Sequence, residues 1–242
     1  MWKYEIIDNF FENKDFNEIM REIEKLNLEK IDGNHMFMAN NRIYKDGSFK
    51  FINKTFKRND YKAPTYSNNI SLSRELITKI HTRYFRILTS KLKEHYPEKL
   101  EIYDFSDLII SVTGKNKVFP PHYDHWEKIL SVVIYLCPEK SIGTKLLISK
   151  NDKNSVEIEW KTNRALIFAR KEDITWHTYN GDGIQNRICL VYNLCTLNSS
   201  AVHKIEGIYL KFLVRNFFNY LRRSLVNTLN ILQIRKYLKK FL

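Results

Sequence analysis

The second half of the chain is a close succession of short, apolar segments rich in β-forming residues. These segments cover residues 108–113, 129–136, 145–149, 155–160, 165–169 and 187–197. Turn-forming residues separate them, among them Pro138, Gly143 and the Gly181-Asp182-Gly183 run. Several short strands at this spacing are typical of a β-sandwich or a β-barrel, so the sequence predicts one of these two architectures for this region.

The part of the chain before this region has a different pattern. Residues 3–8 are expected to form a short strand, and residues 14–27 and 71–96 carry apolar side chains at helical spacing. Residues 28–70 are mixed and polar. Because helices come first and strands follow, the sequence predicts an α+β fold.

Three parts are therefore expected along the chain. Residues 1–100 would form an N-terminal strand with supporting helices, residues 101–200 the β core, and residues 201–242 a helical tail. The length of 242 residues suits one domain with an appendage, and a hydrophobic content of 43% is ample for a core.

The sequence also favours a cytoplasmic location. Its first residues lack the apolar run of a signal peptide, and no apolar stretch is long enough to cross a bilayer. The three cysteines, Cys137, Cys189 and Cys195, have neither the number nor the spacing of a disulfide framework or a zinc site. Cys189 and Cys195 are expected to be buried free thiols, which fits a reducing compartment.

A polar motif, FPPHYDHW at residues 119–126, interrupts the apolar strands. In an extended segment, residues i and i+2 face the same side, so His122 and Asp124 can bind one ion together while Tyr123 points away. A third ligand has to come from another strand, and His177 at the start of the last hairpin is the candidate. Two histidines and one carboxylate form a facial triad that leaves coordination positions open, which suits ferrous iron.

Arg187 opens the last long strand, ten residues after His177. A guanidinium inside an otherwise apolar barrel is costly unless an anion meets it, and its planar fork fits a carboxylate. A dicarboxylic cosubstrate would supply that anion. The alternative is that His122 and Asp124 are a surface pair and that Arg187 belongs to a salt bridge.

Through these residues the sequence resembles the Fe(II)- and 2-oxoglutarate-dependent oxygenases, in particular the prolyl-4-hydroxylase-like branch. The resemblance covers about residues 103–198. It rests on PHYD at 121–124, SVVIYL at 131–136, GTKL at 143–146, WH at 176–177 and NR at 186–187. It implies a double-stranded β-helix, or jelly roll, with N-terminal supporting helices. It also implies an oxidoreductase that uses Fe(II), 2-oxoglutarate and O₂.

The resemblance implies a role for each matching residue. His122, Asp124 and His177 would hold the iron, and Arg187 would bind the distal carboxylate of 2-oxoglutarate. Tyr135 matches a position whose hydroxyl often helps to bind that carboxylate; the alternative is a tyrosine of the core.

Three further positions refine the expected chemistry. Cys189 stands where many relatives carry Ser or Thr, so that hydrogen bond is missing or weak. Asn193 stands where the nucleic-acid demethylases of the superfamily carry a second Arg, which counts against base repair. Asp124 is the carboxylate that related halogenases lack, which favours hydroxylation. Lys128 and Trp126 are expected at the mouth of the barrel, where they could touch the substrate; a solvated Lys128 is the favoured alternative. Residues 34–66 are expected to form a loop over the substrate.

Two functions remain open from the sequence. The first is a dioxygenase that hydroxylates an unidentified substrate, with a small molecule, a saccharide or a lipid-linked glycan favoured over a protein side chain. The second is a non-catalytic jelly-roll scaffold that binds metal and associates with a membrane or a glycan. The fold does not choose between them, because function depends on the site.

The C-terminal tail is strongly basic. The chain has a formal net charge of +13, and residues 204–242 hold nine Lys or Arg against one acid, Glu206. Residues 207–242 are expected to form an amphipathic helix or a pair of helices. Three interpretations stay open: packing on the barrel or on a second subunit, peripheral contact with an anionic membrane, or binding of nucleic acid. Nucleic acid is the least favoured, because the chain has no recognised nucleic-acid module.

Overall fold

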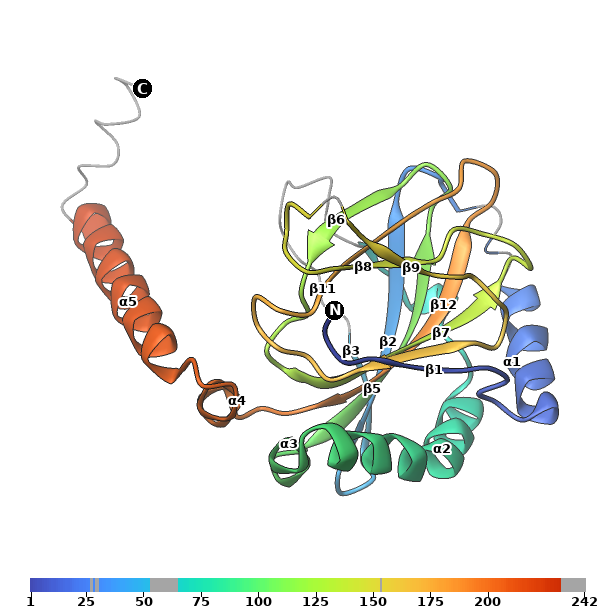
Figure 1. Ribbon diagram of the computed structural model, residues 1–242, viewed down its shortest axis with the longest axis horizontal. Coiled ribbons are helices and arrows are strands. Elements are labelled where there is room, and N and C mark those ends of the chain that lie inside the picture. Colours follow the sequence, from blue (N-terminus) through green and yellow to red (C-terminus); the bar gives the residue numbers. More distant parts are fainter. Residues whose placement is uncertain (27, 29–30, 53–64, 153, 232–242) are drawn as a thin grey trace. The chain divides into compact units, whose positions relative to one another are not determined.

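The computed structural model describes residues 1–26, 28, 31–52, 65–152 and 154–231 (Figure 1). The chain divides into two compact units, residues 1–198 and residues 199–242. Within the described ranges, no helix combines the length and the apolar character needed to cross a membrane. All three cysteines are free, and Cys189 and Cys195 are buried as expected.

The first unit is built on an eight-stranded sheet. Its strands are β1 Glu5–Ile7, β2 Met36–Tyr44, β3 Phe49–Ile52, β4 Thr65–Tyr66, β5 Phe105–Thr113, β7 Lys128–Cys137, β10 Ala165–Phe168 and β12 Arg187–Cys195. Their order is β1-β10-β7-β12-β5-β2-β3, with β4 paired to β2. Every pair is antiparallel except β2 with β4.

A second, four-stranded sheet packs against the first. Its strands are β6 Val118–His122, β8 Thr144–Leu147, β9 Val156–Ile158 and β11 Trp176–Asn180, in the order β6-β11-β8-β9. Side chains from both sheets meet in a shared core, among them Tyr135, Leu146, Ile158 and Phe168. The unit is therefore a double-stranded β-helix within an α+β protein, and the predicted fold class is confirmed.

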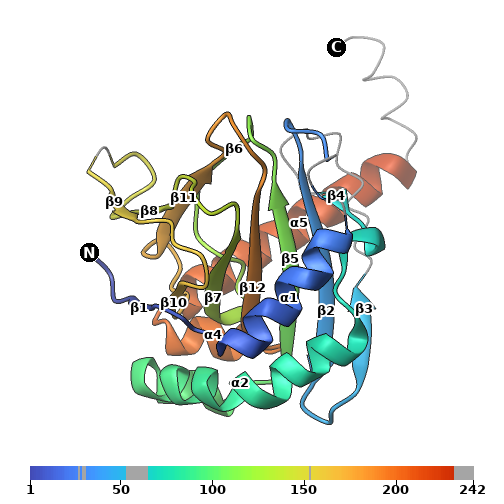
Figure 2. The ribbon, with the colours of Figure 1, turned by 90° about the vertical axis from the view of Figure 1, so that its right-hand side faces the viewer.

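Three helices support the larger sheet. They are α1 Asn13–Lys25, α2 Arg74–His95 and α3 Pro97–Glu101. Helix α2 begins where the Ser73 hydroxyl accepts a hydrogen bond from the Leu76 amide, 3.3 Å away. Its buried residues repeat at helical spacing: Leu76, Ile77, Ile80, Tyr84, Leu88 and Leu92. Helices α1 and α2 lie against the face of the larger sheet that is turned away from the smaller one (Figure 2).

The N-terminal third supplies strands to the same sheet as the β core. Residues 36–44 pair with β5 along its whole length, from Met36 opposite Thr113 to Tyr44 opposite Phe105. Strand β1 pairs with β10 in the same way. Residue 100 therefore does not separate two compact units.

The expectation of a loop at residues 34–66 is wrong for β2 and β3. The polar residues that suggested it, Asn41 and Arg42, are buried in β2, where they bond to Ser71 and Asp107. When the polar side chains of a strand have their partners on other elements, the sequence of the strand alone resembles that of a loop. Residues 53–64 of the expected loop lie outside the described residues.

Arg42 and Asp107 form a buried, two-pronged ion pair between β2 and β5. Their hydrogen bonds measure 2.8 and 2.9 Å, and each residue is 7% exposed. We expect Asp107→Ala to lower the free energy of unfolding by about 3–5 kcal/mol, because it leaves a buried guanidinium unpaired. Urea unfolding measures the loss. Glu159→Ala is the control, since Glu159 pairs with Arg164 at the surface and should change stability by less than about 1 kcal/mol. Equal effects of the two changes would contradict the prediction.

The second unit is helical. It contains α4 Ser199–Ile205 and α5 Tyr209–Ile231. Gly207 joins them with a positive φ of 74°, and the amide of Ile208 bonds to the carbonyl of His203 at 2.9 Å. A glycine with a positive φ, followed by such a backbone hydrogen bond, commonly ends a helix. The described part of the tail therefore forms two helices and not one. Residues 232–242 of the expected helical tail lie outside the described residues.

Candidate metal centre

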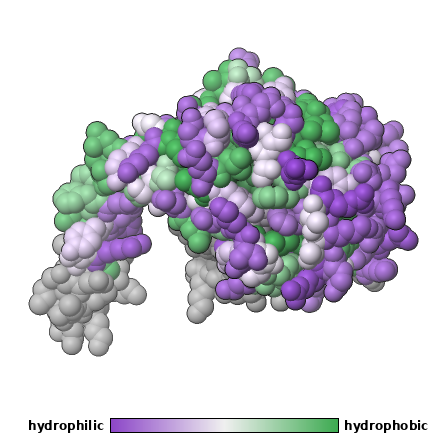
Figure 3. Space-filling model, turned by 90° about the horizontal axis from the view of Figure 1, so that it is seen from below, coloured by the Kyte–Doolittle hydropathy of each residue, from purple (hydrophilic) through white to green (hydrophobic). Residues whose placement is uncertain are grey.

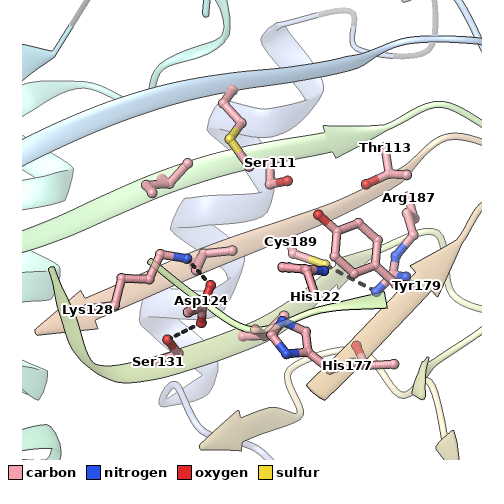
Figure 4. Close-up of a pocket in the computed structure, with 15 residues that line it drawn as sticks. Ser111, Thr113, His122, Asp124, Lys128, Ser131, His177, Tyr179, Arg187 and Cys189 are labelled. Atoms are coloured by element: carbon pink, nitrogen blue, oxygen red, sulfur yellow. Dashed lines mark hydrogen bonds and ion pairs between the residues drawn. The ribbon is translucent and has the colours of Figure 1, made fainter. Parts of the chain in front are cut away.

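Three side chains of the smaller sheet and its connecting loop come together (Figure 4). His122 ends β6, Asp124 follows it in the loop, and His177 lies directly opposite His122 in β11. One ligand atom from each residue lies within 4.8 Å of the others. The i, i+2 spacing and the cross-strand pairing thus place two imidazoles and one carboxylate around a common point.

Both imidazoles are in the neutral form that can bind a metal. The partly buried position of His122, together with the adjacent His177, lowers its pKa to about 3. Burial also lowers the pKa of His177. In each ring we assign the proton to Nδ1, which lies 3.0 Å from a carbonyl, that of Pro120 for His122 and that of Thr175 for His177. The Nε2 atoms are then left as acceptors for an ion.

Asp124 is held by three neighbours. Lys128 Nζ lies 2.6 Å from Oδ1, and the Ser131 hydroxyl donates to Oδ2 at 2.6 Å. Arg170 Nε donates to the Asp124 carbonyl at 3.1 Å. Burial by itself would raise the pKa of this carboxyl, but the ammonium of Lys128 lowers it well below its usual range. Asp124 is therefore ionised and fixed in place.

The expectation of a solvated Lys128 is wrong. Its side chain is 27% exposed and forms the ion pair with Asp124 inside the pocket. Lys128 opens β7 and is four residues from Asp124 along a tight loop. This spacing lets the ammonium reach the carboxylate, although the segment between them forms no helix.

Arg187 is buried a short way from these residues in the same pocket. It is 1% exposed, and its Nε and Nη1 atoms have no hydrogen-bond partner among the described residues. Its remaining nitrogen, Nη2, lies 3.9 Å from Cys189 Sγ, a weak acceptor. The rings of Trp160 and Tyr179 each lie 5.0 Å from the guanidinium carbon. The guanidinium is thus desolvated and lacks a full set of partners.

The pocket that joins the triad to Arg187 has a mixed lining. Its apolar lining comes from Met38, Ile109, Val133 and Val191. Its polar lining includes the hydroxyl groups of Ser111, Thr113, Thr144 and Tyr179. Its floor is the inward face of the larger sheet, where successive strands place residues in register, such as Cys189, Ser111 and Met38. Figure 4 shows Ser111, Thr113 and Arg187 along this floor and the triad opposite.

Tyr135 does not line the pocket. Its hydroxyl donates to Thr144 Oγ1 at 2.9 Å and accepts from the Thr144 amide at 3.1 Å. Its ring stacks on Trp160, with centroids 4.4 Å apart. Thr144 and Tyr179 reach the pocket near Arg187 instead. Thr144 belongs to the GTKL motif of the resemblance but had no assigned role, and Tyr179 was not among the candidate residues.

Several residues of the site were missed because each carries a weak sequence signal. Ser131 alternates with apolar residues in β7, as Ser111 and Thr113 do in β5, so a two-residue period could have found them. Arg170 offers no such signal. Its position behind Asp124 depends on the fold of the chain after β10.

No family model and no curated protein matches the sequence. Solved structures share its fold. A prolyl-4-hydroxylase from Pseudomonas putida superposes with a TM-score of 0.50 at 9% identity, covering 80% of this chain and 92% of that one. The protein IDO from Bacillus thuringiensis does so with a TM-score of 0.50 at 14% identity, covering 80% and 90%. A viral collagen prolyl hydroxylase from Paramecium Bursaria Chlorella virus-1, in its 2OG complex, gives 0.46 at 15% identity, covering 80% and 96%.

The chain therefore has the fold of the prolyl-4-hydroxylase type of oxygenase, and the resemblance found in the sequence is confirmed at the level of the fold. What the protein does with this fold has to be argued from the pocket.

Proposed function

We propose that the protein is an Fe(II)- and 2-oxoglutarate-dependent dioxygenase that hydroxylates a small molecule, a saccharide or a lipid-linked glycan. The observation that carries the proposal is one pocket that contains both a His-Asp-His cluster and a buried guanidinium with unpartnered nitrogens. Each of these features needs a ligand, and the two ligands implied are a divalent metal and an anion.

The donor set fits ferrous iron. His122, Asp124 and His177 would hold it, since two neutral imidazoles and one ionised carboxylate suit Fe(II) and leave positions for other ligands. Bound there, the metal would supply the activation of O₂ on which oxidation of an unreactive C–H bond depends. Ser131 and Arg170 keep Asp124 in position from behind. Outer contacts of this kind typically change metal affinity or activity by about 10–100-fold.

Arg187 fits the distal carboxylate of a dicarboxylic acid. A buried guanidinium binds a carboxylate through two parallel hydrogen bonds, and its nitrogens here have room for them. The aromatic rings of Trp160 and Tyr179 and the apolar walls keep water away, which strengthens that ion pair. Tyr135 and Cys189 would act indirectly, through Thr144 and the packing around Arg187.

A metal-binding scaffold is the second candidate, and Arg187 argues against it. A scaffold needs no anion beside its metal. A buried guanidinium without its partners costs stability, so its presence is explained better by a cosubstrate that binds there.

The test is an anaerobic titration of Fe(II) and then 2-oxoglutarate into the purified protein. The visible charge-transfer band of the 2-oxoglutarate chelate should grow to one equivalent, and succinate should form when O₂ is admitted. Omission of Fe(II) is the control. A folded protein that gives neither the band nor succinate would rule out the oxygenase and leave the scaffold.

The ion pair of Lys128 predicts that this lysine competes with the metal. The ammonium lies on Asp124 Oδ1 and repels a cation bound between the histidines. We expect Lys128→Met to bind Co(II), a spectroscopic substitute for Fe(II), about tenfold more tightly than the unaltered protein, as measured by the visible spectrum. Lys145→Met is the control, because Lys145 pairs with Glu157 away from the pocket. Weaker binding by Lys128→Met would mean that Lys128 positions Asp124 for the metal instead.

A further inference from the structure

Within the second unit, helix α5 presents a hydrophobic stripe that α4 does not cover. Seven of its large apolar side chains are between 44% and 75% exposed: Leu210, Leu213, Val214, Phe217, Phe218, Tyr220 and Leu221. Green, hydrophobic side chains accordingly cover much of the helical segment at the left of Figure 3. Apolar exposure of this extent along one helix marks an interaction surface.

The stripe and the positive charges occupy different sides of the helix. At 100° per residue, the seven apolar side chains fall within an arc of about 160°. The four Lys or Arg of α5, which are Lys211, Arg215, Arg222 and Arg223, fall on the remaining side. The sequence of α5 contains no Asp or Glu. All charged side chains of α5 are therefore basic and lie opposite the apolar stripe.

The second unit uses the opposite side of α5 for its own packing. Phe212 stacks on His203 of α4, with ring centroids 4.3 Å apart, and Arg215 Nη2 lies 3.1 Å from His203 Nε2. On the helical wheel, Phe212 lies about 160° or more from the centre of the stripe. Helix α4 thus fixes the start of α5 without covering its apolar side.

We propose that α5 binds in the interface of an anionic lipid bilayer, with its apolar stripe among the acyl chains and its Lys and Arg side chains at the headgroups. A helix with a wide apolar face, a polar face rich in Lys and Arg and no acids has the charge and shape for this surface. Phe217, Phe218 and Tyr220 supply the aromatic side chains that favour the boundary between headgroups and acyl chains.

Charge decides against a second copy of α5 and against nucleic acid as partners for this surface. Two copies of α5 packed stripe to stripe would cover the apolar side chains, but neither helix has an acid to pair with the Lys and Arg of the other. Nucleic acid would engage the Lys and Arg side chains but would leave Leu210, Leu213 and Leu221 in water. A bilayer with anionic headgroups satisfies both sides of the helix at once. This proposal rests on α5 alone and is independent of the iron site.

The test is sedimentation of the full-length protein with lipid vesicles. Vesicles of phosphatidylcholine and phosphatidylserine in a three-to-one ratio should bind the protein at least about tenfold more tightly than phosphatidylcholine alone, because each Lys or Arg near an anionic surface contributes about 1 kcal/mol. High salt should reduce the difference, since the Debye length falls to about 3 Å at 1 M.

Two variants separate the apolar and the basic contributions. Phe217→Gln/Phe218→Gln should weaken binding to both kinds of vesicle, and Arg222→Glu/Arg223→Glu should remove the preference for phosphatidylserine. Asn219→Gln, on the polar side, should leave binding unchanged. Circular dichroism checks that each variant is folded.

Three results would overturn the proposal. The first is equal, weak binding to both kinds of vesicle. The second is a dimer in solution that Phe217→Gln/Phe218→Gln converts to a monomer, which would assign the stripe to a second copy. The third is tighter binding to an RNA or DNA oligonucleotide than to phosphatidylserine vesicles at the same salt concentration.

Discussion

Replacing Arg187 with methionine is expected to abolish 2-oxoglutarate binding and also to stabilise the protein when no cosubstrate is present. The guanidinium is 1% exposed, and two of its nitrogens lack hydrogen-bond partners among the described residues. The rings of Trp160 and Tyr179 offset only part of the cost of burying the charge. Methionine fills a similar volume without a charge, and such replacements of buried ionic groups often stabilise proteins by about 1–4 kcal/mol.

Urea unfolding with and without 2-oxoglutarate measures both effects under anaerobic conditions with Fe(II). We expect Arg187→Met to raise the free energy of unfolding by about 1 kcal/mol in the absence of 2-oxoglutarate. The unaltered protein should gain about 2.7 kcal/mol when 2-oxoglutarate is present at a hundred times its dissociation constant, and the variant should gain nothing.

A second buried arginine provides the matched control. Arg42 is paired with Asp107 on the same sheet, so Arg42→Met leaves a buried carboxylate unpaired. That variant should lose stability and still bind 2-oxoglutarate. If Arg187→Met bound 2-oxoglutarate normally, or lost as much stability as Arg42→Met, the guanidinium would be structural and the anion site would be refuted.

The sequence was most informative where the spacing of residues along a strand brought together side chains that can bind one ion. His122 and Asp124 are two residues apart in an extended segment, and their shared side follows from strand geometry alone. The spacing of six apolar segments predicted a sandwich or a barrel, and each segment overlaps a strand of the structure. The jelly roll itself was implied by the family resemblance. That His177 would face His122 across β6 and β11 could be expected only from the family resemblance, because cross-strand register is not encoded locally.

The failures have a common physical cause. Strand β2 contains the polar residues Asn41 and Arg42. Their partners are Ser71, just before α2, and Asp107 of β5, and the sequence of β2 alone does not reveal such partners. Lys128 was expected in water for the same reason, since its pairing with Asp124 depends on how the loop between them turns. Arg170 reaches the Asp124 carbonyl from forty-six residues away. The spacing of residues within one segment therefore cannot predict which side chains reach the site through contacts between distant segments.

Replacing His177 with alanine is expected to remove the metal and, with it, all 2-oxoglutarate turnover. His177 is 5% exposed, and its ring lies 4.2 Å from that of His122, so alanine would leave His122 and Asp124 as the two remaining ligands of the cluster. Loss of an outer partner of a metal ligand already costs about 10–100-fold, and we expect loss of this ligand to lower turnover at least about a thousandfold.

Two readouts separate metal loss from unfolding in this variant. Anaerobic titration with Co(II) should show that His177→Ala binds the metal at least about a hundredfold more weakly than the unaltered protein, which would lower the occupancy of the site and so the rate. Circular dichroism should show unchanged strand content. His35→Ala is the matched control, because His35 is exposed and pairs with Asp32 outside the pocket. It should keep full metal binding and turnover. A His177→Ala protein that bound Co(II) normally would show that the three side chains do not form the metal centre, and the proposal of an oxygenase would fall with it.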